Sequence, residues 1–404
     1  MAKRTDIPEF GPLSGIKVVH ATMSVAGPIA AQLMADYGAE VIWIESPLSP
    51  DIARTGTGAT AQQDRRNQRT IALNIPSPEG KEIFLKLIED ADIFIETSRG
   101  GQYSKWGLTD EVMWERNPRL VIVHISGFGQ DGVEEYVFRA SYDPVAQAFG
   151  CYMQLNGYPD RPPVPAMPVT ADYLTGLLAL SAGLAALLKA KETGKGESID
   201  VAQYEALMRF QNNFAVEYLN HGKKPVREGN HSSTAAGYGS YTCKDGKEVY
   251  MLFLGGGVLK NGLSFLGLEY GSKDFPARMP VVFLGTPGGE KLEARIKEYC
   301  ASKTAAEVEK ELNAVGVPCS MVMDYETAVN HPHYQAREVF VEWEKVNGEK
   351  FKGINVFPKF KNNPGRIWRG APGIGMDNED ILSELGYSPE DIEELYKKKV
   401  IIKG

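Results

Sequence analysis

The sequence predicts an α/β protein whose larger part is a doubly wound parallel sheet. Short β-branched runs alternate with amphipathic helical segments between residues 16 and 201. Polar or glycine-rich loops follow several of these runs. Alternation becomes poor after about residue 225, which indicates a second, α+β domain. We therefore expect a large domain from residues 1–222 and 331–404, and a small domain from 225–330.

The first βαβ unit lies near the N-terminus. Residues 16–20 form a buried strand, and Ala26-Gly27-Pro28 opens a helix that ends at Gly38. Residues 40–45 form the second strand, so a right-handed crossover and a parallel pair are expected. No G-x-G-x-x-G follows the first strand, which disfavours a nicotinamide-dependent dehydrogenase.

Further strands are expected at residues 70–74, 91–96 and 120–125, with helices at 77–89 and 110–116. Ligands of doubly wound sheets bind beyond the carboxyl ends of the strands. The loops at 26–28, 98–105 and 126–130 occupy such places. Arg99 and Lys105 are thus candidate phosphate contacts, with ordinary surface cations as the alternative. Four arginines in the polar stretch 50–70 (Arg54, Arg65, Arg66 and Arg69) are either solvated or a second phosphate cluster.

Asp172 stands between a proline-rich segment and an apolar helix. Four prolines between residues 162 and 168 keep the chain extended, and the Leu/Ala run that follows ends in lysines and Gly194. Asp172 therefore falls at or near the helix N-cap. It either caps the helix or is a nucleophile that the positive helix end keeps ionised. The apolar run 173–188 predicts a buried helix rather than a membrane span.

The rest of the chain supplies the small domain and a return to the large one. A strand at 198–201 precedes a helix at 203–219, and 222–240 is a long loop. We expect a hairpin at 241–254 with Asp245-Gly246 as its turn, helix at 289–315 and a strand at 316–323. Strands at 339–343 and 351–354, an irregular segment at 358–376 and two helices joined at Gly386 complete the chain.

Composition limits the function classes. The 404 residues carry a net charge of -8 with no basic block, so nucleic acid is not an expected partner. Four cysteines without metal or disulfide spacing indicate reduced thiols and a cytoplasmic location. The start has no apolar segment of a signal peptide. His331 and His333 have no third ligand nearby in the sequence, so we expect no metal.

Several stretches, in this order and spacing, resemble the class III CoA-transferases (CaiB/BaiF-like). They are LSGIKVVHATMSVAGPIAAQLMADYGAEVIWIE, LVIVHISGFGQDG, SYDPVAQAFG, PVTADYLTGLLALSAGLAALLKAKETGKGESIDVAQYEA and LGYSPEDIEEL. ADIFIETSRGGQYSKWGLTDEV and FPKFKNNPGRIWRGAPGIGMD are most similar to the members of the family that act on L-carnitine. Those members have an arginine at the place of Trp106, and many family members have a lysine at the place of Trp43.

The resemblance implies a Rossmann-like large domain built from both chain ends, and an interlocked, ring-like homodimer. It implies acyl-CoA as co-substrate, no tightly bound cofactor, a small carboxylic acid as second substrate, and no membrane partner. It assigns catalysis to Asp172. It implies CoA contacts at Ala26, Leu73, Ser98, Arg99 and Lys105, and substrate contacts at Val25 and Tyr142.

The expected reaction moves CoA between crotonobetainyl-CoA or γ-butyrobetainyl-CoA and L-carnitine, through an aspartyl-CoA thioester on Asp172. One alternative is a CoA-transferase for another small acid, hydroxy or aryl. Another is an α-methylacyl-CoA racemase, although the racemase histidine is replaced here by Tyr142. A thioesterase and a CoA-binding protein without catalysis are further alternatives. Dependence on an acceptor acid distinguishes a transferase from the racemase, the thioesterase and the CoA-binding protein.

Overall fold

The computed structural model describes residues 4–403, which divide into two units. The first unit contains the chain up to Met153, Pro165–Ala215, and the chain from Ala336 onward. The second contains Gln154–Val164 and Val216–Gln335. Residues 154–164, expected in the large domain, belong to the second unit. These residues are tied to Arg227 of the second unit, because its guanidinium donates hydrogen bonds to the carbonyl oxygens of Gln154, Tyr158 and Arg161.

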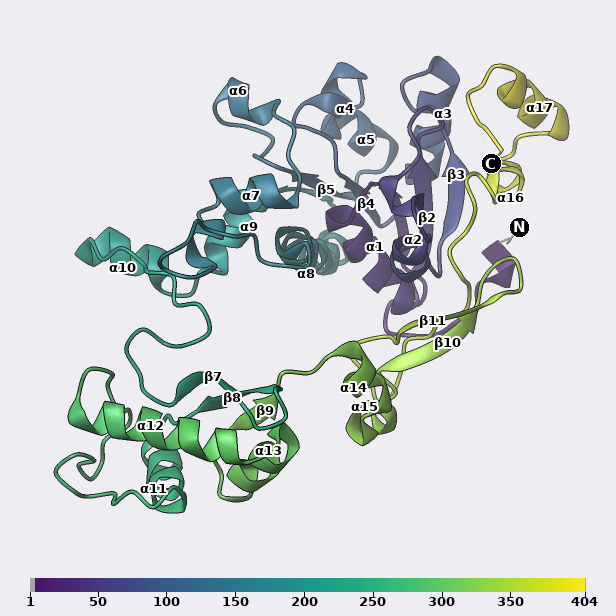
Figure 1. Ribbon diagram of the computed structural model, residues 1–404. Helices are drawn as coiled ribbons and strands as arrows, with labels where there is room; N and C mark the ends of the chain where they lie inside the picture. The colour runs from purple at the N-terminus through teal and green to yellow at the C-terminus, as the bar shows by residue number, and fades with distance from the viewer. Residues whose placement is uncertain (1–3, 404) are drawn as a thin grey trace. The chain divides into compact units, whose positions relative to one another are not determined.

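A six-stranded parallel sheet forms the centre of the first unit (Figure 1). Its strand order is β3-β2-β1-β4-β5-β6. The strands are β1 Lys17–Ala21, β2 Glu40–Glu45, β3 Arg69–Ala72, β4 Ile93–Glu96, β5 Val121–Ser126 and β6 Glu197–Ala202. The order reverses between β1 and β4, which is the place where doubly wound sheets bind ligands. The predicted α/β class is confirmed.

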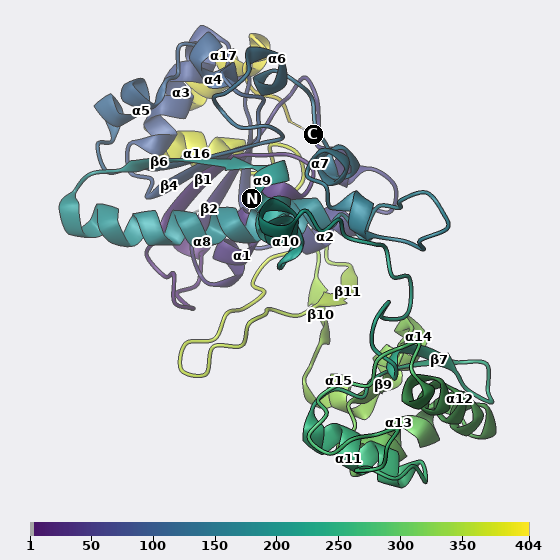
Figure 2. The same cartoon turned by 90° about the vertical axis from the view of Figure 1, so that its left-hand side faces the viewer.

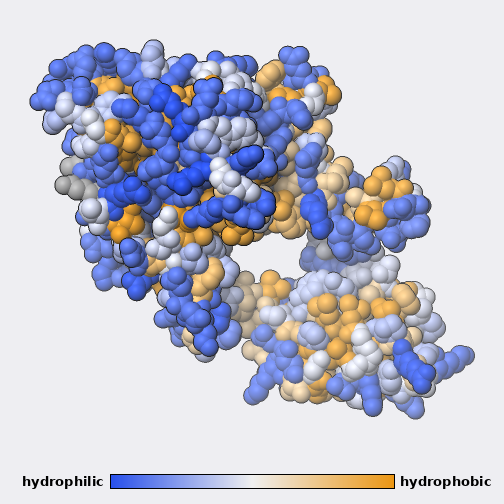
Figure 3. All heavy atoms as spheres, turned by 180° about the vertical axis from the view of Figure 1, so that it is seen from behind, coloured by the Kyte–Doolittle hydropathy of each residue, from blue (hydrophilic) through white to orange (hydrophobic). Residues whose placement is uncertain are grey.

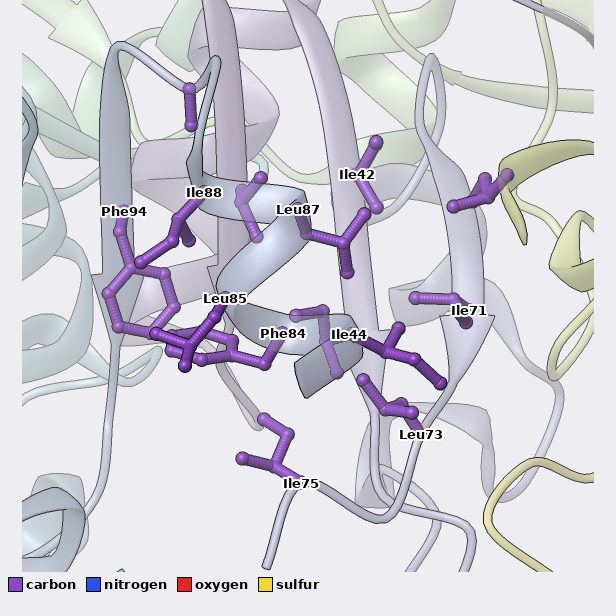
Figure 4. Close-up of a cluster of buried hydrophobic side chains, with 14 of the residues drawn as sticks. Ile42, Ile44, Ile71, Leu73, Ile75, Phe84, Leu85, Leu87, Ile88 and Phe94 are labelled. Carbon is purple, nitrogen blue, oxygen red and sulfur yellow. The ribbon is translucent and has the colours of Figure 1, made fainter. Parts of the chain in front are cut away.

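Helices cover both faces of this sheet (Figure 2). On one face α3 (Pro78–Ile88) packs its buried side chains, including Phe84, against Ile44 and Phe94 of the strands (Figure 4). On the other face α1 (Ala26–Asp36) and α8 (Thr170–Thr193) pack against Val18 and Val123. Neighbouring residues such as Val18 and Val19 thus enter different cores, as the two-residue period of a strand requires.

The α-helices up to residue 221 are α1 Ala26–Asp36, α2 Ala59–Asp64, α3 Pro78–Ile88, α4 Gln102–Lys105, α5 Asp110–Arg116, α6 Glu134–Val137, α7 Asp143–Phe149, α8 Thr170–Thr193, α9 Gln203–Arg209 and α10 Phe214–His221. The single helix predicted for 203–219 is therefore wrong. The chain breaks between α9 and α10, where Asn212 takes a left-handed φ of 51° that a helix cannot contain.

Helix α8 is long and apolar enough to cross a membrane by length and composition. In the structure it packs against α1, α9, β5 and β6. Gly176 makes the contact with α1 close: a Cβ at this position would lie 2.5 Å from the Ala26 carbonyl oxygen and would collide with the Ile29 side chain. Helix α8 is thus a core helix of the first unit.

The second unit is α+β. Its antiparallel sheet has the order β7-β8-β9, from β7 Tyr238–Thr242, β8 Glu248–Leu252 and β9 Cys319–Met321. The predicted hairpin is present, with Gly246 at a φ of 74° in its turn. The helices are α11 Gly256–Phe265, α12 Pro287–Ser302, α13 Ala305–Ala314, α14 Tyr325–Asn330 and α15 Pro332–Ala336. The helix predicted for 289–315 is two helices, because Thr304 and Glu307 form a capping box that starts α13.

The C-terminal part of the chain returns to the first unit. It contains the antiparallel pair β10 Phe340–Glu344 and β11 Lys350–Ile354, followed by α16 Asn378–Glu384 and α17 Pro389–Lys397. At the edge strand β3, Asp377 Oδ2 accepts a hydrogen bond from the Thr70 amide, and Asn378 Oδ1 accepts one from the Ala72 amide. The C-terminal segment thereby occupies backbone donors on the outer edge of the sheet.

Candidate functional site

A cavity of about 700 Å³ opens at the carboxyl edge of the parallel sheet, within the first unit. Its walls come from the ends of β1 to β5, the start of α1, and side chains of α4, α7, α8 and α9 or the loops before them. Its lining includes Thr22, Ser24, Ala26, Glu45, Asp51, Leu73, Ile75, Thr97, Ser98, Arg99, Tyr103, Trp106, Ser126, Gly127, Ser141, Tyr142, Asp172 and Gln203. A cavity of this volume is large enough for a sizeable ligand.

Most of the residues singled out in the sequence meet in this cavity. The lining contains Ala26, Leu73, Ser98, Arg99, Tyr142 and Asp172. Lys105 and Val25 are not among the lining residues. The Lys105 ammonium lies 4.2 Å from the centre of the Phe138 ring, and Val25 is the N-cap residue of α1.

Asp172 is the third residue of α8 and does not cap it. The N-cap is Val169, and the helix start is bonded instead by Asp143, the first residue of α7. Asp143 Oδ2 accepts hydrogen bonds from the amides of Ala171 (2.6 Å) and Asp172 (3.2 Å). The capping interpretation of Asp172 is therefore wrong. Its buried carboxylate lines the cavity and accepts a hydrogen bond from Gln203.

The ionisation of Asp172 also differs from expectation. Burial and the neighbouring Asp143 carboxylate raise the pKa of Asp172 to about 7, and the Gln203 amide opposes them only in part. The positive end of α8 was expected to keep the group ionised. Asp143 instead accepts hydrogen bonds from amides of that helix start, and its negative charge opposes ionisation of the neighbouring Asp172 carboxyl.

Gln203 is a site residue that the sequence did not reveal. Its Nε2 donates a hydrogen bond of 2.5 Å to Asp172 Oδ1, and its Oε1 accepts one of 3.2 Å from Ser141 Oγ. Gln203 directly follows β6, at the same carboxyl edge as the other loops. Ligands of doubly wound sheets bind beyond the carboxyl ends of the strands, and the same rule applied to β6 would have selected Gln203.

The four arginines of residues 50–70 are structural. Each one faces a carboxylate, so none belongs to a free phosphate cluster. The pairs are Arg54 with Glu45 (2.8 Å), Arg65 with Asp51, Arg66 with Asp36 (2.6 Å) and Arg69 with Glu384 (2.8 Å). Trp43 lies between two of them, with its ring centre 4.7 Å from the Arg54 guanidinium carbon and 4.8 Å from that of Arg65.

A buried ion triad supports the loop that carries Ser98 and Arg99. His124 Nδ1 donates to Glu96 Oε1 (2.8 Å), and its Nε2 donates to Asp110 Oδ1 (2.9 Å). Burial disfavours the imidazolium, but these two carboxylates outweigh it and raise the pKa of His124 to about 10. Glu96 Oε2 accepts a hydrogen bond of 2.5 Å from the Ser98 amide. The triad therefore fixes the backbone at the cavity wall.

The arrangement provides the parts of a covalent site. A carboxylate and an amide donor meet at a cavity wall, beside the first turn of α1, whose N–H groups have no partner within the helix. Such N–H groups stabilise developing negative charge. Among residues 4–403, no cluster of histidine, cysteine, aspartate and glutamate could hold a metal ion.

Comparisons with known proteins agree on one family. Residues 13–378 match CoA-transferase family III. The bile acid CoA-transferase BaiK of Clostridium scindens is 43% identical over 398 residues, which cover 98% of this chain and 90% of that protein. The crystal structure of a CaiB/BaiF family protein from Brucella suis superposes with a TM-score of 0.79 and 29% identity, over 93% of this chain and 100% of that one. Rv3272 of Mycobacterium tuberculosis has the same fold, with a TM-score of 0.79 and 23% identity over 92% and 99% of the two chains.

Proposed function

Because the chain belongs to CoA-transferase family III and is a CoA-transferase, we propose that Asp172 is the nucleophile that carries CoA between two carboxylic acids. One observation carries this proposal. Asp172 is a buried residue of the cavity wall, and the start of its own helix is hydrogen-bonded by Asp143 rather than by Asp172. A side chain free of a structural duty at this place is available for chemistry.

The reaction proceeds by exchange between carboxyl groups and needs no external energy source. The ionised Asp172 carboxylate attacks the acyl-CoA carbonyl carbon. The C–S bond then breaks, CoA leaves as thiolate, and a mixed anhydride of Asp172 and the donor acid remains. The thiolate then attacks Cγ of Asp172 and releases the donor acid as carboxylate, leaving an aspartyl-CoA thioester. The acceptor carboxylate takes CoA from this thioester by the reverse steps. Thioester energy is conserved throughout.

The cavity walls have distinct duties in this scheme. Arg99 is an exposed cation on the wall and would bind CoA phosphate, with Ser98 beside it. The first-turn amides of α1, near Ala26, would stabilise an oxyanion. Lys105 stays a proposed phosphate contact, and it would have to leave the Phe138 ring to make one.

For the acceptor acid we propose a bile acid. The support is the 43% identity to a protein named as a bile acid CoA-transferase, over nearly the whole of both chains. L-carnitine is the second candidate. It is favoured by the sequence likeness of residues 91–112 and 357–377 and by Tyr142, whose 58% exposed ring on the cavity wall could face a trimethylammonium group.

The first experiment is intact-mass spectrometry of the protein after incubation with a panel of acyl-CoA thioesters, with and without hydroxylamine. The panel contains bile acyl-CoA, γ-butyrobetainyl-CoA, crotonobetainyl-CoA and an aryl-CoA. We expect an acyl or CoA adduct on Asp172 in the wild type and none in Asp172→Asn. Steady-state transfer to free bile acid, L-carnitine and hydroxy or aryl acids identifies the acceptor.

A matched control keeps this test specific. Asp92 lies at the opposite, amino edge of the sheet and accepts a hydrogen bond of 2.9 Å from the Lys17 amide. Asp92→Asn removes a carboxylate of the same kind outside the cavity and should keep the adduct. If Asp172→Asn forms the adduct as the wild type does, the proposed nucleophile is wrong. CoA release that is independent of any acceptor would instead favour a thioesterase.

A further inference from the structure

Gln203 is in contact with the atom that changes charge when Asp172 reacts. It is 6% exposed, begins α9 and lies on the cavity wall. Its Nε2 is 2.5 Å from Asp172 Oδ1. The described hydrogen bonds to the Asp172 carboxylate, among residues 4–403, end on Oδ1. This leaves Oδ2 as the oxygen that can bond to a substrate.

When Asp172 is ionised, the amide of Gln203 has one orientation. The ionised carboxylate only accepts hydrogen bonds, so the NH₂ group must face it. On the other side, the Ser141 hydroxyl donates to Oε1 at 3.2 Å. Ser141 is itself held close to Gly127, where any Cβ would collide with the serine side chain. The Ser141 hydroxyl thus donates to Gln203, and Gln203 donates to Asp172, so the three side chains form one hydrogen-bond chain that ends on the carboxylate.

We propose that Gln203 is a catalytic residue whose Nε2–H group stabilises the oxyanion that forms on Asp172 Oδ1 whenever Cγ of Asp172 is attacked. This inference rests on the proposed role of Asp172 as the nucleophile. Ser141 acts through Gln203 and is a positioning residue.

The electron balance shows why Oδ1 is the atom to stabilise. In the mixed anhydride Oδ2 bridges to the donor acyl carbon and Oδ1 is the carbonyl oxygen. When the CoA thiolate attacks Cγ, the C=O electron pair moves onto Oδ1. The pair returns as the Cγ–Oδ2 bond breaks, and Oδ2 leaves with the donor acid. Attack of the acceptor carboxylate on the aspartyl-CoA thioester again places the charge on Oδ1. A preorganised donor at this atom lowers both barriers.

Attack on the acyl-CoA itself is different, because its oxyanion forms on the substrate oxygen. Loss of Gln203 should therefore slow the two attacks on Cγ more than it slows anhydride formation. Its loss also affects ionisation. The groups that face Asp172 are Asp143 of α7, Tyr173 of α8 and the Gln203 amide, and of these the amide favours the ionised carboxyl. Its removal should move the acid limb of the pH–rate profile to higher pH.

The test uses Gln203→Met, which keeps the volume and removes the donor. We expect kcat to fall roughly 10²-fold or more, with KM for acyl-CoA unchanged. In Gln203→Met the intact-mass adduct should shift from the CoA adduct toward the acyl adduct, because the anhydride persists. Ser141→Ala should show the same shift to a smaller extent.

Gln211→Met is the matched control. Gln211 is a buried glutamine (5% exposed) outside the cavity lining, and its Nε2 donates to the Gly150 carbonyl oxygen. It should change thermal stability without changing kcat or the adduct. Equal kcat losses in Gln203→Met and Gln211→Met, or wild-type kcat in Gln203→Met, would overturn the inference while leaving the role of Asp172 intact. An adduct in Asp172→Asn would overturn the proposed function itself.

Discussion

Asp172 is a buried carboxylate next to a second buried carboxylate. It is 5% exposed and Asp143 is 3% exposed, and the hydrogen-bond partners described for the two side chains are amide groups. An ionised Asp172 in these surroundings loses its hydration and is repelled by Asp143. The native state therefore keeps a proton on Asp172 up to a higher pH than the unfolded chain does.

This difference predicts a pH-dependent stability gain in Asp172→Asn. The pKa of Asp172 rises from an ordinary 3.8 to about 7, so the native state binds more protons than the unfolded state between these values, and wild-type stability falls as pH rises through this window. Above pH 7 the variant should be more stable by roughly 2–4 kcal/mol, since one pKa unit corresponds to about 1.4 kcal/mol. Urea unfolding at pH 8 and pH 5 measures the difference.

At pH 5 only the part of this loss that lies between pH 3.8 and pH 5 has occurred, so the two proteins should differ less than at pH 8. Asp92→Asn again serves as the control. A stability difference that stays the same at pH 5 and pH 8 would mean that Asp172 keeps its ordinary pKa.

At the scale of elements, the position of the site depends on how closely α8 approaches α1. The two helices meet at Gly176, one turn after Asp172, where the Ala26 carbonyl and the Ile29 side chain leave no room for a methyl group. This contact sets the distance between the Asp172 carboxylate and the first-turn amides of α1. A second glycine of the same helix, Gly183, is in a looser place, where a Cβ would lie 3.5 Å from Val123.

The same substitution at these two glycines should have opposite effects. Gly176→Ala should destabilise the protein by roughly 1–3 kcal/mol, because the helices must separate, and should lower kcat. Gly183→Ala should be neutral or stabilising by up to about 1 kcal/mol, since alanine is the better helix former and fits the space. Chemical unfolding and steady-state kinetics check both. Equal behaviour of the two variants would show that the approach of the helices does not position the site.

The elements of the sheet could be predicted because their signals are local. Short β-branched runs, Pro28 at a helix start and Gly194 at a helix end each act within a few residues. The details of the site could not be predicted, because they depend on contacts between residues that are distant in the sequence. Asp143 caps α8 from 28 residues away, Gln203 reaches Asp172 across 31 residues, and Arg69 meets Glu384 across 315. No local pattern distinguishes a buried, paired arginine from an exposed one.

At the scale of the molecule, part of α8 stays exposed although it is apolar. Leu188 is 74% exposed and Leu177 is 45% exposed. Phe210, which follows α9, is 44% exposed. The face of the molecule that Figure 3 shows is largely hydrophilic, with apolar patches between, one of them broad on the second unit. Large exposed apolar side chains such as Leu177 and Leu188 are typical of an interaction surface. We propose that this face of α8 is covered by a second copy in the homodimer that the sequence likeness implies.

Light scattering after size-exclusion chromatography tests this proposal. We expect a dimer for the wild type, and a shift toward monomer for Leu188→Lys, because a buried, unpaired charge disfavours the interface. Val133→Lys is the control, since Val133 is 67% exposed and precedes α6, away from α8. A monomeric wild type, or a Leu188→Lys variant that dimerises as tightly as the wild type, would contradict the proposal.

The cover on the β3 edge has a consequence for synthesis on the ribosome. All the residues that line the cavity have been translated by Gln203, and the strand edge itself by Ala72. The groups that bond this edge, Asp377 and Asn378, emerge about 300 residues after the strand. Until then the nascent chain has unpaired backbone N–H groups along the edge of β3, and these can pair with other nascent chains. A premature stop codon shortly before Asp377 would therefore yield a chain that possesses every cavity residue and still aggregates.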